Sequence, residues 1–142
     1  MNSPFPVGSE TGKLLGIWQD VSLRLVPEVR VSDVFVKPLL SAGQLQVEVT
    51  ISNQSGSPAY VEITGEVVPW INQADDKRPG VPAGAYGDPV LPLPRNIAMV
   101  ANGESAKVLM VVSTNGVLDE WTPASPKLHG VNLKISENRK PV

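Results

Sequence analysis

Acidic residues are the first candidates for chemistry in this sequence, because two carboxylates held in a cleft can act as general acid and base. Glu62 and Glu66 are an even number of positions apart in an alternating segment, which places both on one, solvated face of a strand. Asp75 and Asp76 precede Arg78 in a segment rich in Pro and Gly. A solvated loop tip is the simplest interpretation there, and contact with calcium or a sugar is the alternative. We predict no catalytic residue among these acids.

His129 is the single histidine, and no serine or aspartate near it in the sequence defines a catalytic triad with it. One histidine excludes metal sites that need two or more histidine ligands. The absence of cysteine excludes disulfides, thiolate metal sites and a cysteine nucleophile. Gly80, Gly84 and Gly87 do not form a phosphate-binding loop, since they do not follow a strand and open a helix. The sequence therefore predicts no metal and no cofactor.

Aromatic side chains in loops remain as candidates, because they can stack on the C–H faces of sugar rings. Trp70 and Tyr86 lie in the Pro- and Gly-rich segment, and Trp121 precedes the last predicted strand. A simpler interpretation is that the two tryptophans cap the ends of the domain or contact another domain. The candidate residues for contact with a sugar or a neighbouring domain are Trp70, Asp75, Asp76, Arg78, Tyr86 and Trp121.

The composition is that of one globular domain, with 142 residues, 42% of them hydrophobic, and a net charge of −2. Intrinsic disorder is excluded by the hydrophobic content. A nucleic-acid partner is not expected, because 12 basic residues do not exceed 14 acidic ones. No apolar run approaches a membrane span, and the N-terminus lacks the pattern of a signal peptide.

Alternation of apolar and polar residues predicts an all-β domain, with a period of two and no helical period. The strands are expected at 15–26, 29–38, 45–52, 59–68, 97–101, 106–113 and 131–136. We expect an antiparallel β-sandwich of about seven strands, in which 45–52 and 59–68 form a β-hairpin. The residues predicted to face the core are Leu45, Val47, Val49, Ile51, Val61, Ile63, Leu109, Val111, Leu133 and Ile135.

Residues 69–95 interrupt this rhythm with six prolines and three glycines. Proline removes a backbone donor and fixes φ, so the segment is predicted to be a long loop rather than the interior of a sheet. Long loops within compact domains are often functional, and we expect this loop to be the functional surface of the chain.

Two segments resemble parts of glycoside hydrolase family 2 enzymes, the family of β-galactosidases, β-mannosidases and β-glucuronidases. Residues 14–40, LLGIWQDVSLRLVPEVRVSDVFVKPLL, resemble the junction at which a jelly-roll domain ends in a Gly-Ile-Trp-Arg/Gln-Asp-Val strand and an immunoglobulin-like sandwich begins. Residues 118–135, LDEWTPASPKLHGVNLKI, resemble the end of that sandwich, with a Trp-x-Pro-x-x-Pro-x-Leu pattern before the final strand. In the family a Tyr usually follows this Leu, and here His129 stands in its place. The two segments cover 45 of the 142 residues.

The resemblance implies that residues 1–26 are a linker and the terminal strand of a preceding sugar-binding jelly-roll domain. Residues 27–137 would be an immunoglobulin-like β-sandwich carrying the long loop 69–95. The family's catalytic glutamates lie in a later (β/α)₈ barrel, and no residue here corresponds to them. The chain alone is therefore expected to be inactive, within a periplasmic or secreted bacterial parent that hydrolyses glycosides. Its partners would be the jelly-roll domain and the barrel, with carbohydrate as a further ligand. The alternative is a stand-alone carbohydrate-binding or adhesive β-sandwich module.

Overall fold

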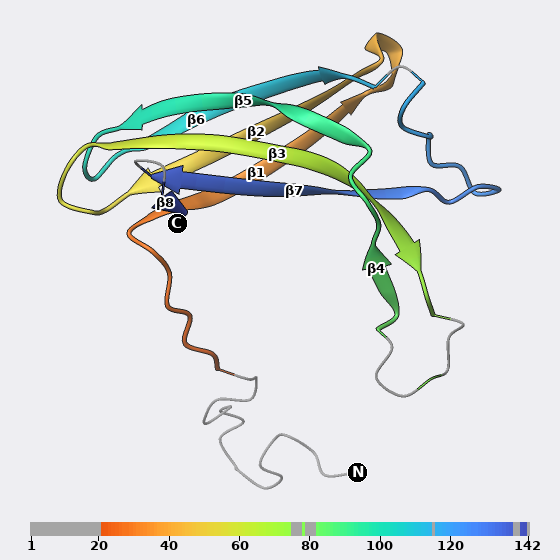
Figure 1. The fold of residues 1–142 in the computed structure, drawn as a ribbon, viewed down its shortest axis with the longest axis horizontal. Helices are drawn as coiled ribbons and strands as arrows, with labels where there is room; N and C mark the ends of the chain where they lie inside the picture. The colour runs from red at the N-terminus through yellow and green to blue at the C-terminus, as the bar shows by residue number, and fades with distance from the viewer. Residues whose placement is uncertain (1–20, 75–77, 79–81, 115, 138–139, 142) are drawn as a thin grey trace, which may run out of the picture.

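The computed structural model describes residues 21–74, 78, 82–114, 116–137 and 140–141, and it is all-β (Figure 1). The strands are β1 (Val29–Leu39), β2 (Gln44–Asn53), β3 (Ala59–Asn72), β4 (Gly84–Tyr86), β5 (Leu91–Val100), β6 (Ser105–Ser113), β7 (Leu128–Glu137) and β8 (Lys140–Pro141). A single 3₁₀ turn, Leu40–Ala42, joins β1 to β2 within the described residues. The predicted all-β class is confirmed. None of the helices in the described ranges is long and apolar enough to cross a membrane.

Two antiparallel sheets pack face to face without closing into a barrel (Figure 1). One sheet has the order β1-β2-β6, and the other has the order β4-β3-β7-β8, with β5 also paired to β3. These orders match the A-B-E and C-F-G sheets of immunoglobulin-type sandwiches. β5 takes the place of a C′ strand, because it pairs with β3 instead of joining the sheet of β6.

The core lies between the inner rows of β2 and β3. Val47, Val49 and Ile51 of β2 are 0% exposed, as are Val61 and Ile63 of β3. The strict alternation along both strands places every second side chain on the dry face. The predicted inner rows of these two strands are confirmed, and Leu133 and Ile135 of β7 pack against the same cluster.

The predicted register of β6 is wrong by one residue. Leu109 and Val111 are 53% and 41% exposed, whereas Met110 is 0% exposed. Residues 108–112 are all apolar, so alternation could not decide which side faces inward. Pairing with β2 decides it, because Met110 stands opposite Val47 and must point to the same face.

The predicted hairpin between 45–52 and 59–68 is also wrong, since β2 and β3 belong to different sheets. Asn53, at the end of β2, is 0% exposed and holds the crossing between the sheets. Its Nδ2 donates to the carbonyls of Ser57 (2.7 Å) and Val100 (2.9 Å), and its Oδ1 accepts from the backbone N–H of Ser55 (2.9 Å). Its backbone bonds to Gly103 and Glu104 tie the same point to the turn between β5 and β6.

Much of the predicted loop 69–95 is strand instead. β3 continues through Pro69 to Asn72, and β5 begins at Leu91. Pro92 and Pro94 are tolerated because, within the described residues, β5 pairs only with β3 and has a free edge. Pro69 lies between the β5 and β4 pairings, and its carbonyl accepts from the N–H of Gly87 at 2.9 Å. The connection between β3 and β4 spans 73–83, of which 75–77 and 79–81 lie outside the described residues.

Residues 21–26 of the expected strand 15–26 form an exposed arm that pairs with no strand in the described part of the chain (Figure 1). The expectation that a neighbouring domain completes this strand stays a prediction. Val21, Leu23 and Leu25 are 76%, 91% and 90% exposed. Residues 15–20 lie outside the described residues. The apolar side chains of the arm are therefore not buried against any described part of this chain.

The register of β6 is tested by a matched pair of substitutions. Met110→Ala should lower the free energy of unfolding by roughly 2–5 kcal/mol, since it empties a fully buried site. Leu109→Ala, on the exposed face, should lower it by about 0.5 kcal/mol or less. Urea unfolding of both variants measures the difference, and a larger loss for Leu109→Ala would contradict the assigned register.

The crossing at Asn53 is tested by Asn53→Ala. This change leaves the buried Val100 carbonyl and the part-buried Ser55 N–H without their side-chain partner, and should lower the free energy of unfolding by roughly 2–4 kcal/mol. Asn102→Ala is the control, because Asn102 Oδ1 accepts an exposed bond from Gly56. Equal losses in thermal or urea unfolding would show that burial of Asn53 has no special role.

Candidate functional site

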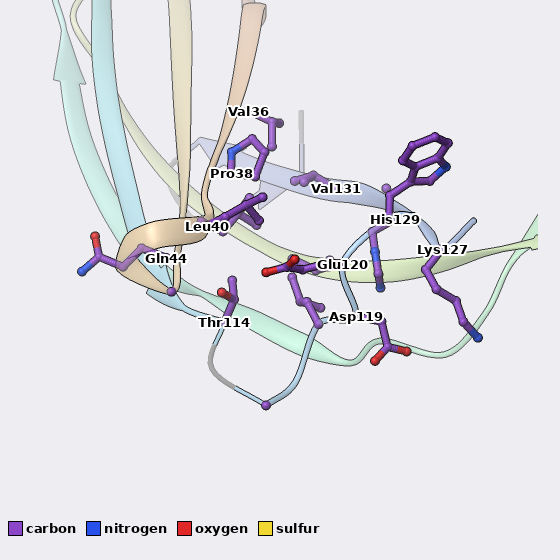
Figure 2. Close-up of a pocket in the computed structure, with 17 residues that line it drawn as sticks. Val36, Pro38, Leu40, Gln44, Thr114, Asp119, Glu120, Lys127, His129 and Val131 are labelled. Atoms are coloured by element: carbon purple, nitrogen blue, oxygen red, sulfur yellow. The ribbon is translucent and has the colours of Figure 1, made fainter. Parts of the chain in front are cut away.

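A partly open cavity of about 430 Å³ lies at one end of the sandwich, between β1 and the start of β7 (Figure 2). Its floor is apolar and includes Val36, Leu40 and Val131. Its rim is mostly polar and comes from the segment before β7 and from the first residues of β7. The rim residues are Asp119, Glu120, Trp121, Lys127 and His129.

This end cavity lacks the arrangement needed for hydrolysis. Asp119 and Glu120 are both exposed neighbours in sequence, rather than carboxylates facing each other across a cleft. In the described ranges, no group of three or more His, Asp or Glu residues could hold a metal ion. The apolar floor suits contact with another apolar surface, and the rim suits hydrogen bonding around it.

The sandwich is open along the side next to this cavity. β8 pairs only with Ser136 and Glu137, so the outer edge of β7 over 128–135 has no strand partner in the described part of the chain. Val34 and Val36 share the inward register of β2, yet both are 39% exposed. An unpaired edge above uncovered apolar side chains is a surface that a partner can extend or cover.

A second candidate site is an aromatic pair on the outer face of the β4-β3-β7-β8 sheet. Trp70 of β3 stands directly opposite Tyr86 of β4. Their ring centroids are 5.0 Å apart, with an interplanar angle of 71°. Trp70 is 37% exposed and Tyr86 is 64% exposed, so part of each ring faces solvent.

Two glycines without side chains leave room for these rings to pack directly against the backbone of the sheet. A Cβ at Gly130 of β7 would be 2.6 Å from Cε1 of Tyr86. A Cβ at Gly84 of β4 would overlap the six-membered ring of Trp70. Glycine in a strand often marks such a close approach. Sequence reasoning missed both roles, because Gly84 lies in the predicted loop 69–95 and Gly130 directly precedes the strand predicted at 131–136.

The structure brings two of the six predicted contact residues together. Trp70 and Tyr86 form the aromatic pair, and Trp121 lies instead at the rim of the end cavity. Arg78 is exposed in the connection between β3 and β4. Asp75 and Asp76 lie outside the described residues. The cavity and the pair meet at Gly130, whose backbone lines the cavity while Tyr86 covers its opposite side.

Shifted pKa values occur on the outer face of the β1-β2-β6 sheet. Lys107 Nζ donates to Glu48 Oε1 at 2.7 Å. This hydrogen bond, reinforced by charge attraction, holds the pKa of Glu48 below its ordinary 4.5 and that of Lys107 above its ordinary 10.5. Lys107 is exposed, Glu48 is half-buried, and neither lines the end cavity, so they form a surface ion pair rather than a catalytic one.

Comparisons with known proteins give little for this chain. No family model and no curated protein sequence matches it. Among solved structures, the chain is similar to DesR, a β-glucosidase from Streptomyces venezuelae in complex with D-glucose, at 16% sequence identity with a TM-score of 0.42. The alignment covers 80% of this chain and 14% of the DesR chain. The likeness is too remote to transfer a ligand or a residue role.

The ion pair on the outer face gives a pH-dependent prediction. Since the folded-state pKa of Glu48 is depressed, its favourable contribution is present above the unfolded-state pKa and is lost as the pH falls through the folded value. Lys107→Ala removes the hydrogen bond and the positive charge that lower the pKa of Glu48, so this pKa should rise towards its ordinary value. NMR titration of the Glu48 carboxyl carbon measures the change. Lys134→Ala, on the other sheet, should leave it unchanged. The same Glu48 titration curve in both variants would contradict the pairing.

Proposed function

We propose that this chain is a non-catalytic β-sandwich domain of a glycoside hydrolase family 2-like enzyme that degrades carbohydrate. In this role it holds a preceding sugar-binding domain against a following catalytic barrel. The resemblance of residues 14–40 and 118–135 to that family supports the proposal, and so does the immunoglobulin-type strand order.

The observation that carries the proposal is the exposed arm before β1. Val21, Leu23 and Leu25 alternate with polar residues, as in a strand with one buried face, yet all three are more than 75% exposed. Burying one such side chain stabilises a protein by roughly 1.5–3 kcal/mol. A row of three is therefore suited to a sheet outside this sandwich, as the last strand of a neighbouring domain would be.

The open end of the sandwich supports the same role. The end cavity has an apolar floor, and Leu40 and Trp121 beside it are 65% and 56% exposed. Contiguous exposed apolar surface of this kind marks an interaction site. Domain contacts at the arm and at the end cavity would place this chain between two neighbours.

Catalysis is assigned to the parent enzyme and not to this chain. Glu62 forms an ion pair with Arg95, and Glu66 accepts a hydrogen bond from Asn132. These partners lie on the outer face of the β3 sheet, where the carboxylates stand in a row instead of facing a cleft. We expect the purified chain to show no turnover of aryl-glycosides. Turnover that is abolished by mutating one of its own acids would contradict this.

The domain role is tested on the complete reading frame and on the arm. Sequencing the locus should show a barrel with two catalytic glutamates downstream. In the protein encoded by that frame, replacing Leu23 and Leu25 by Ser should lower the Tm by about 3 °C or more. In the 142-residue chain the same change should alter the free energy of unfolding by less than about 0.5 kcal/mol.

The control for the arm is Ser22→Ala, which should leave both proteins unchanged. A reading frame without a barrel would favour the stand-alone module. An unchanged Tm of the whole protein after the double substitution would show that the arm is not part of a domain contact.

A further inference from the structure

The aromatic pair on the outer face of β3 and β4 differs from an ordinary surface patch, because one of its rings packs against the backbone of a third strand. Tyr86 reaches from β4 across β3 to Gly130 of β7, because β3 lies between these two strands. Val68, which pairs with Gly130, points to the same face and is only 6% exposed. The ring thus rests on the sheet with one side and presents the rest, 64% of the residue, to solvent.

Trp70 holds this ring in place from the side. The two rings are nearly perpendicular, with an interplanar angle of 71°, so together they form a corner and not a continuous flat surface. The position of Trp70 over Gly84 is available only because that residue lacks a side chain. Rigid exposed aromatic rings supply contact area with little loss of conformational entropy on binding.

Polar partners lie in the next row of the same face. Glu66 and Asn132 stand opposite each other in the β3–β7 ladder, two positions beyond Val68 and Gly130. Asn132 Nδ2 donates to Glu66 Oε1 at 3.2 Å, which leaves the other carboxylate oxygen and the amide oxygen to meet a ligand. A carboxylate next to an amide offers acceptors and donors to vicinal hydroxyl groups.

We propose that this face binds a neutral pyranose unit of a soluble oligosaccharide. The C–H face of the sugar stacks on Tyr86, its edge abuts Trp70, and its hydroxyls bond to Glu66 and Asn132. The corner geometry suits one sugar unit and excludes the flat surface of a crystalline polysaccharide. The carboxylate of Glu66 favours neutral sugars over uronates. This site does not rest on the domain role, since the arm takes no part in it and Gly130, whose opposite side faces the end cavity, is the one residue it shares with that cavity among those named here.

The experiment titrates the 142-residue chain with cellohexaose, β-1,4-mannohexaose, β-1,4-xylohexaose and β-1,4-galactohexaose, followed by amide NMR and calorimetry. At least one should bind and shift the amide signals of Tyr86, Gly130 and Asn132. Tyr86→Ala should weaken that binding by about tenfold or more. Gly130→Ala should weaken it as well, because the added Cβ displaces the ring while the aromatic residue is kept.

Phe35→Ala is the matched control, since Phe35 is an exposed aromatic residue, 53% accessible, on the opposite sheet. It should bind sugar as the parent chain does. Unfolding curves of the three variants show whether each remains folded, and Glu66→Gln, which keeps the shape of the side chain, gives a second measurement with an expected loss of about threefold or more.

Absence of binding to all four oligosaccharides at 10 mM would overturn the proposal, as would equal affinities of Tyr86→Ala, Gly130→Ala and the parent chain. If Tyr86→Ala instead lowers the Tm of the protein encoded by the whole reading frame while no sugar binds, the face is a domain contact and the proposal is wrong. The domain role itself would stand in that case, because its tests use the arm and the reading frame.

Discussion

The dry contact between the inner rows of β2 and β3 is the constraint on which the rest of this structure depends. Val47 and Ile51 on one sheet and Val61 and Ile63 on the other are fully buried. A slip of one residue in either strand would turn its whole apolar row to solvent, so both registers are strongly determined. The two strands then position their neighbours, because β2 pairs with β1 and β6 while β3 pairs with β4, β5 and β7.

The two sides of the sandwich differ in how completely they are closed. On one side, Asn53 joins the β2–β3 crossing to the β5–β6 turn through buried hydrogen bonds, and Val100 beside it is 1% exposed. On the other side, β7 has an unpaired edge in the described part of the chain and Val36 is 39% exposed. A buried polar residue with all its bonds made fixes the geometry of the closed side. The open side leaves apolar surface for a partner.

The register of β3 also separates two surfaces that could serve different purposes. Inward residues such as Val67 line the end cavity, and outward residues such as Trp70 carry the aromatic pair. Gly130 is the point where the surfaces meet, since its backbone lines one and the Tyr86 ring covers the other side. A contact with another domain at the cavity and contact with a sugar at the rings are therefore compatible in the same protein.

What the sequence by itself determined was the alternation of β2, β3 and β7, and with it the all-β class and the central part of the core. Where one face must be dry and polar residues mark the other, the pattern is sufficient, as at Leu45 to Ile51. The tertiary structure decided the rest. Pairing with β2 chose Met110 over Leu109 in an apolar run that has no polar marker.

The chain crosses between sheets where the sequence predicted a hairpin, and buried hydrogen bonds of Asn53 lie at this crossing. Pro92 and Pro94 fit in a strand because β5 has a free edge within the described residues. The pairing of Trp70 with Tyr86 and the role of Gly130 also required the fold, because they join residues from three strands that no local pattern connects. Local periodicity reports which face of one strand is dry. Only pairing between strands determines which residues stand opposite each other.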